Sequence, residues 1–176
     1  IVLGDDLYLE AVDHGLQFLK TSHRQEDGSY AWMLQGQVVE DGTRHCYGHA
    51  FVLLAYAAAA KAGIHEAISK CSETYDLLEN RFWKPEFELY VDEISAESWE
   101  NIDPYRGQNA NMHMCEAMLS AFEATEEERY LDRAHTLARR ICLDLSDEAD
   151  GLIWEHYNID WSPNWQYNKK DPKNLF

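Results

Sequence analysis

Ala50-Phe-Val-Leu-Leu-Ala-Tyr-Ala-Ala-Ala-Ala60 is apolar at every position. Alanine and leucine favour helices, and a helix that is apolar on all sides is normally surrounded by other protein elements. We therefore expect a central helix over residues 45–62. The next segment, 65–81, has apolar residues at alternating steps of four and three, which is typical of a helix buried on one side only. Its apolar positions are Ile64, Ile68, Cys71, Tyr75, Leu78 and Phe82.

The same order of helices recurs further along the chain. Residues 109–125 are apolar nearly all round, and residues 127–145 are amphipathic. The apolar positions of this second amphipathic helix lie 66 residues after Ile64, Ile68, Cys71 and Tyr75, and they are Tyr130, Ala134, Leu137 and Ile141. A constant spacing between core positions predicts a repeated hairpin of one inner and one outer helix.

Further elements flank these hairpins. Residues 5–21 predict an amphipathic helix with a buried stripe of Leu9, Val12, Leu16 and Leu19. Residues 28–44, with Gly36 between two short apolar runs, predict a hairpin excursion. The alternation of apolar and polar residues over 152–161 predicts a strand at the same end of the molecule.

Alternating inner and outer helices are the pattern of an α/α toroid. We therefore predict an all-α chain that forms part of an (α/α)6 toroid, with about five helices and short hairpin excursions in the loops. Five helices leave the inner pair with open flanks. Residues 1–176 are accordingly expected to be a single domain within a longer barrel, an expectation that the start at Ile1 and the polar tail 168–176 also suggest.

Composition excludes several classes of protein. The chain has 32 acidic and 15 basic residues and a formal net charge of −17, which is unsuited to binding nucleic acid through phosphate contacts. It has no uninterrupted apolar run of about 18 residues, as a membrane span requires. Its first twenty residues include Asp5, Asp6, Glu10 and Asp13, where a secretory signal would be apolar and basic. A cytoplasmic protein with reduced core thiols is expected, because no two cysteines form a C-x-x-C pair. The cysteines are Cys46, Cys71, Cys115 and Cys142.

The second inner helix opens with the most polar segment of any apolar helix in the chain, Tyr105-Arg-Gly-Gln-Asn-Ala-Asn-Met-His-Met-Cys-Glu116. Asn109 and His113 are four residues apart and share a helix face, and Glu116 follows on a neighbouring part of it. Two interpretations stay open. These side chains either satisfy loop backbone groups, or they line the mouth of the toroid and bind a polyhydroxylated ligand.

Other polar and aromatic residues are weaker candidates. His45 and His49 are four apart at the start of the first inner helix, which is expected to put both imidazoles on one face. The usual third ligand of a zinc site is missing, so capping or packing is the favoured interpretation and no metal is expected. His156 and Asp160 belong to the expected strand. Tryptophans in loops could stack on sugar rings or simply cover the toroid ends. They are Trp32, Trp99, Trp154, Trp161 and Trp165.

Several of these segments resemble a known family. The stretches 47–55 (Tyr-Gly-His-Ala-Phe-Val-Leu-Leu-Ala), 105–117 and the pair Asp160-Trp161 are similar to the N-acylglucosamine 2-epimerase superfamily. The form Asn-Ala-Asn-Met-His of residues 109–113 is most similar to its mannose isomerase branch. The resemblance implies a single (α/α)6 barrel on a chain about twice this long.

The resemblance also implies an activity. Members of the family are aldose–ketose isomerases or 2-epimerases that need no cofactor and move a proton through an enediolate. It implies that Tyr47, Asn109 and His113 bind a monosaccharide, while Arg106 and Glu116 match the family's pocket less closely. The two histidines that act as general acid and base are expected downstream of this chain, and a pocket arginine upstream of it. No residue of residues 1–176 is therefore expected to carry the proton transfer.

The sequence also allows functions other than that of a mannose isomerase. Within the family, the chain could belong to an epimerase acting on N-acylglucosamine or cellobiose. An α/α-toroid glycoside hydrolase would need two carboxylates across the sugar, and Glu116 is the only acid that we place near an inner wall. A non-catalytic sugar-binding protein is a third class, and a homo-oligomer is a further open possibility.

Overall fold

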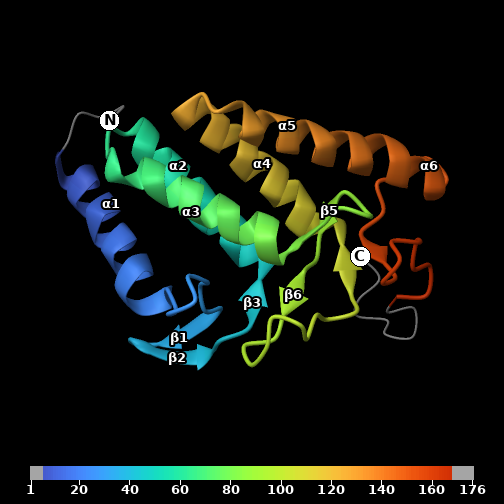
Figure 1. The fold of residues 1–176 in the computed structure, drawn as a ribbon, viewed down its shortest axis with the longest axis horizontal. Helices are drawn as coiled ribbons and strands as arrows, with labels where there is room; N and C mark the ends of the chain where they lie inside the picture. Colours follow the sequence, from blue (N-terminus) through green and yellow to red (C-terminus); the bar gives the residue numbers. More distant parts are fainter. Residues whose placement is uncertain (1–5, 168–176) are drawn as a thin grey trace.

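The computed structural model describes residues 6–167 and is mostly helical (Figure 1). Within this range the helices fall close to the expected segments, and the tail at 168–176 lies outside it. The long helices are α1 (Asp6–Phe18), α2 (Cys46–Lys61), α3 (Glu66–Arg81), α4 (Gln108–Thr125) and α5 (Glu128–Arg139). The π-helical segments η1 (Leu19–His23) and η2 (Arg140–Leu145) extend α1 and α5, and α6 (Ser146–Glu148) adds a last turn.

The two hairpins pack as inner and outer layers. Helices α2 and α4 lie against each other, α3 packs on α2, and α5 packs on α4. The inner helices are rich in alanine, which lets their backbones approach closely. This order of helices confirms the prediction of a partial α/α toroid.

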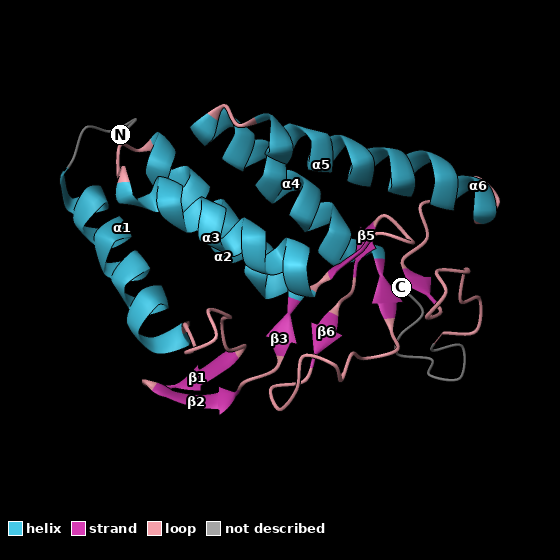
Figure 2. Ribbon diagram, in the orientation of Figure 1, coloured by secondary structure: helices cyan, strands magenta, loops and turns pink. Residues whose placement is uncertain are grey.

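Short strands gather near the ends at which α2 and α4 begin (Figure 2). The hairpin expected over 28–44 is present, with Gly36 at positive φ in its turn. All four pairs are antiparallel. They join β1 (Met33–Gln35) to β2 (Val38–Asp41), β3 (Arg44–His45) to β6 (Glu93–Ile94), β4 (Trp83–Lys84) to β5 (Leu89–Tyr90), and β7 (Arg106–Gly107) to β8 (His156–Tyr157).

The internal repeat is real, but its spacing is 63 residues and not 66. The buried residues of the first outer helix are Ala67, Cys71, Thr74, Leu78 and Phe82, and those of the second are Tyr130, Ala134, Leu137, Ile141 and Leu145. Each member of the second set lies 63 positions after its counterpart. The expected core positions Ile64, Ile68 and Tyr75 are only half-buried. They flank the interface, because small side chains at 67 and 74 allow α3 to approach α2.

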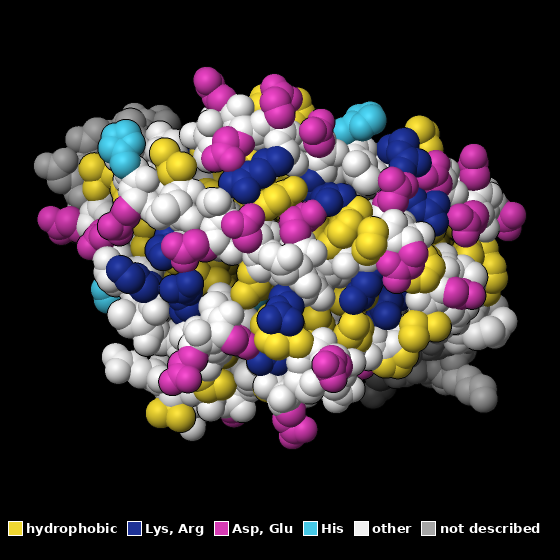
Figure 3. Space-filling model, in the orientation of Figure 1, with side chains coloured by type: hydrophobic (Ala, Val, Ile, Leu, Met, Phe, Trp, Pro, Cys, Tyr) yellow, Lys and Arg dark blue, Asp and Glu magenta, His cyan; other side chains and the backbone are white. Residues whose placement is uncertain are grey.

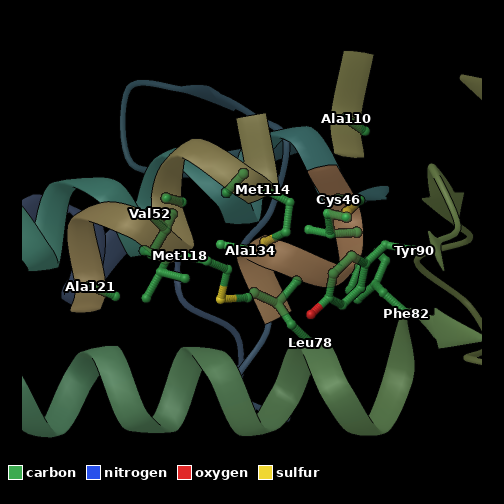
Figure 4. Packing of buried hydrophobic residues seen from close by; sticks show 14 of the residues in the cluster. Cys46, Val52, Leu78, Phe82, Tyr90, Ala110, Met114, Met118, Ala121 and Ala134 are labelled. Atoms are coloured by element: carbon green, nitrogen blue, oxygen red, sulfur yellow. The ribbon is translucent and has the colours of Figure 1, made fainter. Parts of the chain in front are cut away.

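Side chains from both hairpins form one core (Figure 4). Met114 and Met118 of α4 lie between Cys46 and Val52 of α2 and Leu78 of α3. Cys46, Leu78, Met114 and Met118 are fully buried. Methionine fills irregular spaces between helices, so it suits the point at which several helices meet.

The burial expected for α1 was wrong, whereas the open flanks expected for the inner helices are present. Only Leu16 of the predicted stripe on α1 is buried, while Leu9 and Val12 are exposed. The inner helices are uncovered on part of their surface, as expected, because Phe51 on α2 is 40% exposed and Leu119 on α4 is 45% exposed. The flanks of α2 and α4 are therefore open, as five helices of a toroid require.

Two further expectations need correction. Cys142 is exposed on η2, so it is not a core thiol, although Cys46 and Cys71 are. The strand expected over 152–161 is limited to two residues, His156 and Tyr157. A turn follows at once, in which the Asn158 N–H donates to the Ser162 carbonyl at 2.9 Å and Trp161 has positive φ.

The outer surface carries both signs of charge side by side (Figure 3). Arg133 on α5 pairs with Glu79 on α3 and lies 3.4 Å above the Trp83 ring. Arg129 pairs with Asp76 at 3.3 Å between the same helices. These ion pairs connect the two outer helices, α3 and α5. Over residues 6–167, none of the helices combines the length and the apolar character needed to cross a bilayer.

Candidate functional site

A concavity of about 320 Å³ opens where the inner helices begin. Strands β3 and β7 lead into α2 and α4, so the first turns of both helices face the same space. The lining is mixed aromatic, polar and acidic, which is the character of a site for a small polar ligand. It consists of Trp32, His45, Tyr47, Asp92, Glu93, Tyr105, Asn109, Ala110 and Glu155.

The structure brings Tyr47, Asn109 and His113 together. Tyr47 and Asn109 both line the concavity, one from each inner helix. The His113 ring meets the Tyr47 ring edge to face, with 5.2 Å between the centroids, and packs against Phe51 at 4.9 Å. The three side chains predicted to bind a ligand therefore form one cluster around Tyr47, although His113 is not among the residues that line the concavity.

Glu116 acts on His113 in this cluster. One of its carboxylate oxygens lies 3.0 Å from His113 Nδ1, which makes Nδ1 the protonated nitrogen of the ring. Nε2 of a neutral His113 is then an acceptor for a ligand hydroxyl. Glu116 itself is largely exposed, and it orients the imidazole without lining the concavity.

Arg106 lies apart from the cluster. Its guanidinium is buried and donates to the carbonyls of Asp103 and Tyr105, so it stabilises the loop that leads into α4. Its Nε has no hydrogen-bond partner within the described residues. Arg106 therefore shapes the entry to the site and is not among the residues that line it.

His45 and His49 do not share a helix face, contrary to expectation. His45 has extended backbone and precedes the helix, and its ring packs on Trp32 at 4.2 Å. His49 is buried, donates from Nδ1 to the His45 carbonyl at 2.7 Å and accepts the Tyr30 N–H at Nε2. Burial lowers the pKa of His49 to about 4. Residues 6–167 contain no group of three or more His, Cys, Asp or Glu placed to hold a metal.

Two carboxyl groups that the sequence did not indicate, those of Asp92 and Glu155, line the concavity. Asp92 accepts the Gly107 N–H at 2.9 Å, and Glu155 accepts the Gln108 side-chain N–H at 2.9 Å. Burial raises the pKa of Asp92 to about 7, against the opposing effect of Gly107 and Arg106. Burial raises the pKa of Glu155 as well.

Aromatic side chains form the walls. Trp32 comes from the loop before β1 and is partly exposed beside His45. Tyr105 donates to or accepts from His156 Nδ1 at 2.8 Å, and His156 in turn stacks on Tyr167 with 3.9 Å between centroids. His156 thus supports a wall of the concavity through Tyr105.

The remaining tryptophans and Asp160 serve the fold. Trp161 is buried, Trp154 packs on Trp165, and Trp99 lies under the guanidinium of Arg44 at 4.2 Å. Asp160 accepts hydrogen bonds from the Ser162 N–H and hydroxyl within a turn. Of the loop tryptophans, Trp32 lines the concavity.

Sequence reasoning also missed Asn111. This residue is fully buried on α4, accepts the Tyr90 N–H at 2.8 Å and donates to the Tyr90 carbonyl at 3.0 Å. An asparagine on the apolar side of a helix was the available signal, because a buried amide must satisfy both its donor and its acceptor. Asn111 fixes α4 against β5, whereas Asn109 faces the concavity.

The site can recognise a ligand rich in hydroxyl groups. Tyr47 and Asn109 supply donors and acceptors, and Trp32 and Tyr105 supply flat apolar faces. His113 reaches this group of residues through its ring contact with Tyr47. Three carboxyl groups border the same space, which disfavours a negatively charged ligand.

Comparisons with known proteins agree with this picture. The chain is 51% identical to a D-mannose isomerase of Marinomonas mediterranea over 172 residues, which is 96% of this chain and 43% of that protein. A crystal structure of D-mannose isomerase matches with 50% identity and a TM-score of 0.93, over 98% of this chain and 44% of that one. The cellobiose 2-epimerase of Bacillus thermoamylovorans shares the fold, with a TM-score of 0.82 and 20% identity, over 93% of this chain and 45% of that one.

The chain thus spans less than half the length of the relatives that it matches. The N-acylglucosamine 2-epimerase (GlcNAc 2-epimerase) family matches residues 2–176, which is almost the whole sequence. Together with the partial toroid and the concavity at the start of its inner helices, this match shows that the chain belongs to the N-acylglucosamine 2-epimerase family.

Proposed function

We propose that this chain supplies the sugar-binding part of an isomerase that interconverts D-mannose and D-fructose. The observation that carries the proposal is its 51% identity to a D-mannose isomerase over nearly its full length. Two observations support it: Tyr47 and Asn109 line a concavity bordered by three carboxyl groups, and Tyr47 contacts His113. D-Mannose is a neutral polyol, so its recognition depends on hydrogen bonds of this kind.

Each residue of the cluster has a separate part in this proposal. The Tyr47 hydroxyl and the Asn109 amide bind sugar hydroxyls from the two sides of the concavity. His113, held by Glu116 through Nδ1, accepts a sugar hydroxyl at Nε2. Trp32 covers the ring or the extended chain of the sugar.

The chemistry itself needs an acid and a base. Removal of the proton on C2 of the open-chain aldose gives an enediolate; return of a proton to C1 gives the ketose, and return to the opposite face of C2 gives the epimer. Histidine suits this exchange because its pKa lies near neutral pH. We propose that these histidines lie outside residues 1–176, that no cofactor takes part, and that the isolated chain is inactive.

The test is turnover by the complete encoded chain. We expect D-mannose to give D-fructose, measured by chromatography of the sugar products, and residues 1–176 alone to give none. N-Acetylglucosamine and cellobiose serve as parallel substrates. Conversion of either one without conversion of mannose would replace the isomerase by a 2-epimerase, which is the second candidate because the family includes such enzymes.

A glycoside hydrolase is a weaker alternative, although Asp92 and Glu155 now place two carboxyl groups in the concavity. Each of these groups already accepts a hydrogen bond at the start of α4, from the Gly107 N–H or the Gln108 side chain, which assigns both carboxyl groups a part in holding the fold. Release of reducing sugar from an oligosaccharide would favour this alternative.

Location and assembly are also part of the proposal. The buried thiols of Cys46 and Cys71 support a reducing compartment such as the cytoplasm. The open flanks of the inner helices need further protein to cover them. We propose that the rest of the same polypeptide does so, and a second copy of the chain is the alternative.

A further inference from the structure

Asp92 makes hydrogen bonds to the beginnings of both inner helices. Its backbone carbonyl accepts the N–H of Cys46, the first residue of α2, at 2.8 Å. Its carboxylate accepts the N–H of Gly107, the residue before α4, at 2.9 Å. Asp92 is only 8% exposed, and it is one of the residues that line the concavity. One residue therefore connects two helices that belong to different repeats.

The internal repeat shows that this connection is specific. Glu155 lies 63 residues after Asp92, and its carbonyl accepts the Gln108 N–H at 3.1 Å as the Asp92 carbonyl accepts that of Cys46. The two carboxylates differ in direction. The Glu155 carboxylate binds Gln108 of α4, the same residue that its carbonyl binds. The Asp92 carboxylate instead binds Gly107 before α4, whereas its carbonyl binds α2.

The space around Gly107 leaves little room for adjustment. A Cβ at Gly107 would lie 2.8 Å from the Tyr105 hydroxyl oxygen and 3.1 Å from Asp92 Oδ1. The backbone that leads into α4 is thus in close contact with the carboxyl group that holds it. A shift of Asp92 would move this backbone, and Asn109 follows two residues later.

The charged surroundings of Asp92 make its burial costly. Burial is the largest cause of its raised pKa; the Gly107 N–H and Arg106 lower that pKa, and Glu155 and Glu93 raise it further. Groups whose pKa is perturbed by burial and by specific charged neighbours concentrate at functional sites.

We propose that Asp92 is a positioning residue that couples the first turns of α2 and α4 and so fixes the separation of Tyr47 and Asn109 across the concavity. The role in sugar binding rests on the proposed function. The structural coupling can be measured without any substrate.

The first experiment measures amide hydrogen exchange in the complete encoded chain, wild type and Asp92→Ala. Loss of the carboxylate removes the partner of the Gly107 N–H directly, but it leaves the carbonyl that Cys46 uses. We expect exchange to become about tenfold faster at both Gly107 and Cys46 in the variant. Faster exchange at Gly107 alone, or at neither amide, would overturn the coupling.

The second experiment compares kinetics with D-mannose. Asp92→Ala should raise KM about tenfold, the cost of one well-placed hydrogen bond, with less than about a threefold change in kcat. Asp92→Asn keeps an acceptor oxygen, so its KM should stay within about threefold of wild type. An Asn variant as impaired as the Ala variant, or a loss confined to kcat, would contradict the positioning role.

Asp103→Ala is the matched control. Asp103 is exposed on the loop between β6 and β7, and its carboxylate accepts the Tyr105 N–H at 2.8 Å. Asp103 does not line the concavity. We expect wild-type KM and wild-type exchange at Cys46. If the wild-type chain converts no mannose, the proposed function fails while the exchange experiment still decides the coupling.

Discussion

At the scale of single residues, Asp92 gives the folded chain a distinctive pH dependence. Burial raises its pKa from 3.8 to about 7, so the folded state holds this proton more tightly than the unfolded state does. Its contribution to the free energy of unfolding is complete below about pH 4 and is lost as pH rises through about 7. Asp92→Asn removes this dependence. The melting temperature of the variant minus that of wild type should therefore increase between about pH 4 and pH 8.

Thermal melts followed by circular dichroism across this range check the prediction. The charged groups that act on Asp92, namely Arg106, Glu93 and Glu155, are the same in both proteins. Asp103→Asn, at an exposed position outside the concavity, is melted in parallel as the control for loss of one carboxyl group. A constant difference for Asp92→Asn would show that its carboxyl group is not perturbed.

His113 should matter for activity more than for stability. Its ring is partly exposed and packs on Tyr47 and Phe51 at the edge of the concavity. Replacement by alanine in the complete chain should lower kcat/KM for mannose at least about tenfold, the effect of one lost hydrogen bond to substrate. The melting temperature should change little. Steady-state kinetics and a melt on the same sample decide, and unchanged kinetics would remove His113 from the site.

Part of the site could be predicted from the sequence. Family resemblance selects Tyr47, Asn109 and His113, and helical spacing independently places Asn109 and His113 on one face. Asp92 and Glu155 could not be found, because they lie in loops without periodicity and face the concavity only through tertiary pairing of two-residue strands.

At the scale of elements, the buried side of the first outer helix can be tested by mutation. Leu78 is fully buried on α3, whereas Ile68 is half-buried at the edge of the interface. Leu78→Ala should lower the free energy of unfolding by about 2–5 kcal/mol, and Ile68→Ala by less than about half as much. Denaturant titrations of both variants measure the two values. Equal losses would support the 66-residue spacing over the observed 63.

The helices themselves were predicted well, since their periodicity extends over many residues. The spacing of the repeat was wrong because hydrophobicity alone selects Ile64, Ile68 and Tyr75. The contact with α2 instead uses the smaller Ala67 and Thr74, and the need for close approach is a property of the partner helix. The two-residue strands of residues 83–107 are too short to leave a pattern.

At the scale of the whole molecule, an apolar wall lies open along the inner helices. Phe51 is 40% exposed, and Met112 and Leu119 are each 45% exposed. Residues 1–176 in isolation should therefore bind a hydrophobic dye and self-associate, despite a net charge of −17. Light scattering after size exclusion should give a mass above 20.5 kDa that increases with concentration. A monodisperse monomer with a cooperative melt would contradict this.

The central claim is that the chain binds a sugar for isomerisation through an enediolate. Proton NMR of the complete encoded chain with D-mannose in deuterated water tests it most directly. The account predicts fructose together with deuterium at C2 of the recovered mannose, because the proton removed from C2 can exchange with solvent. If neither fructose nor deuterium exchange occurs with mannose, while an N-acetylhexosamine or cellobiose exchanges, the isomerase assignment is wrong; if no sugar exchanges, the proton-transfer function is wrong as well.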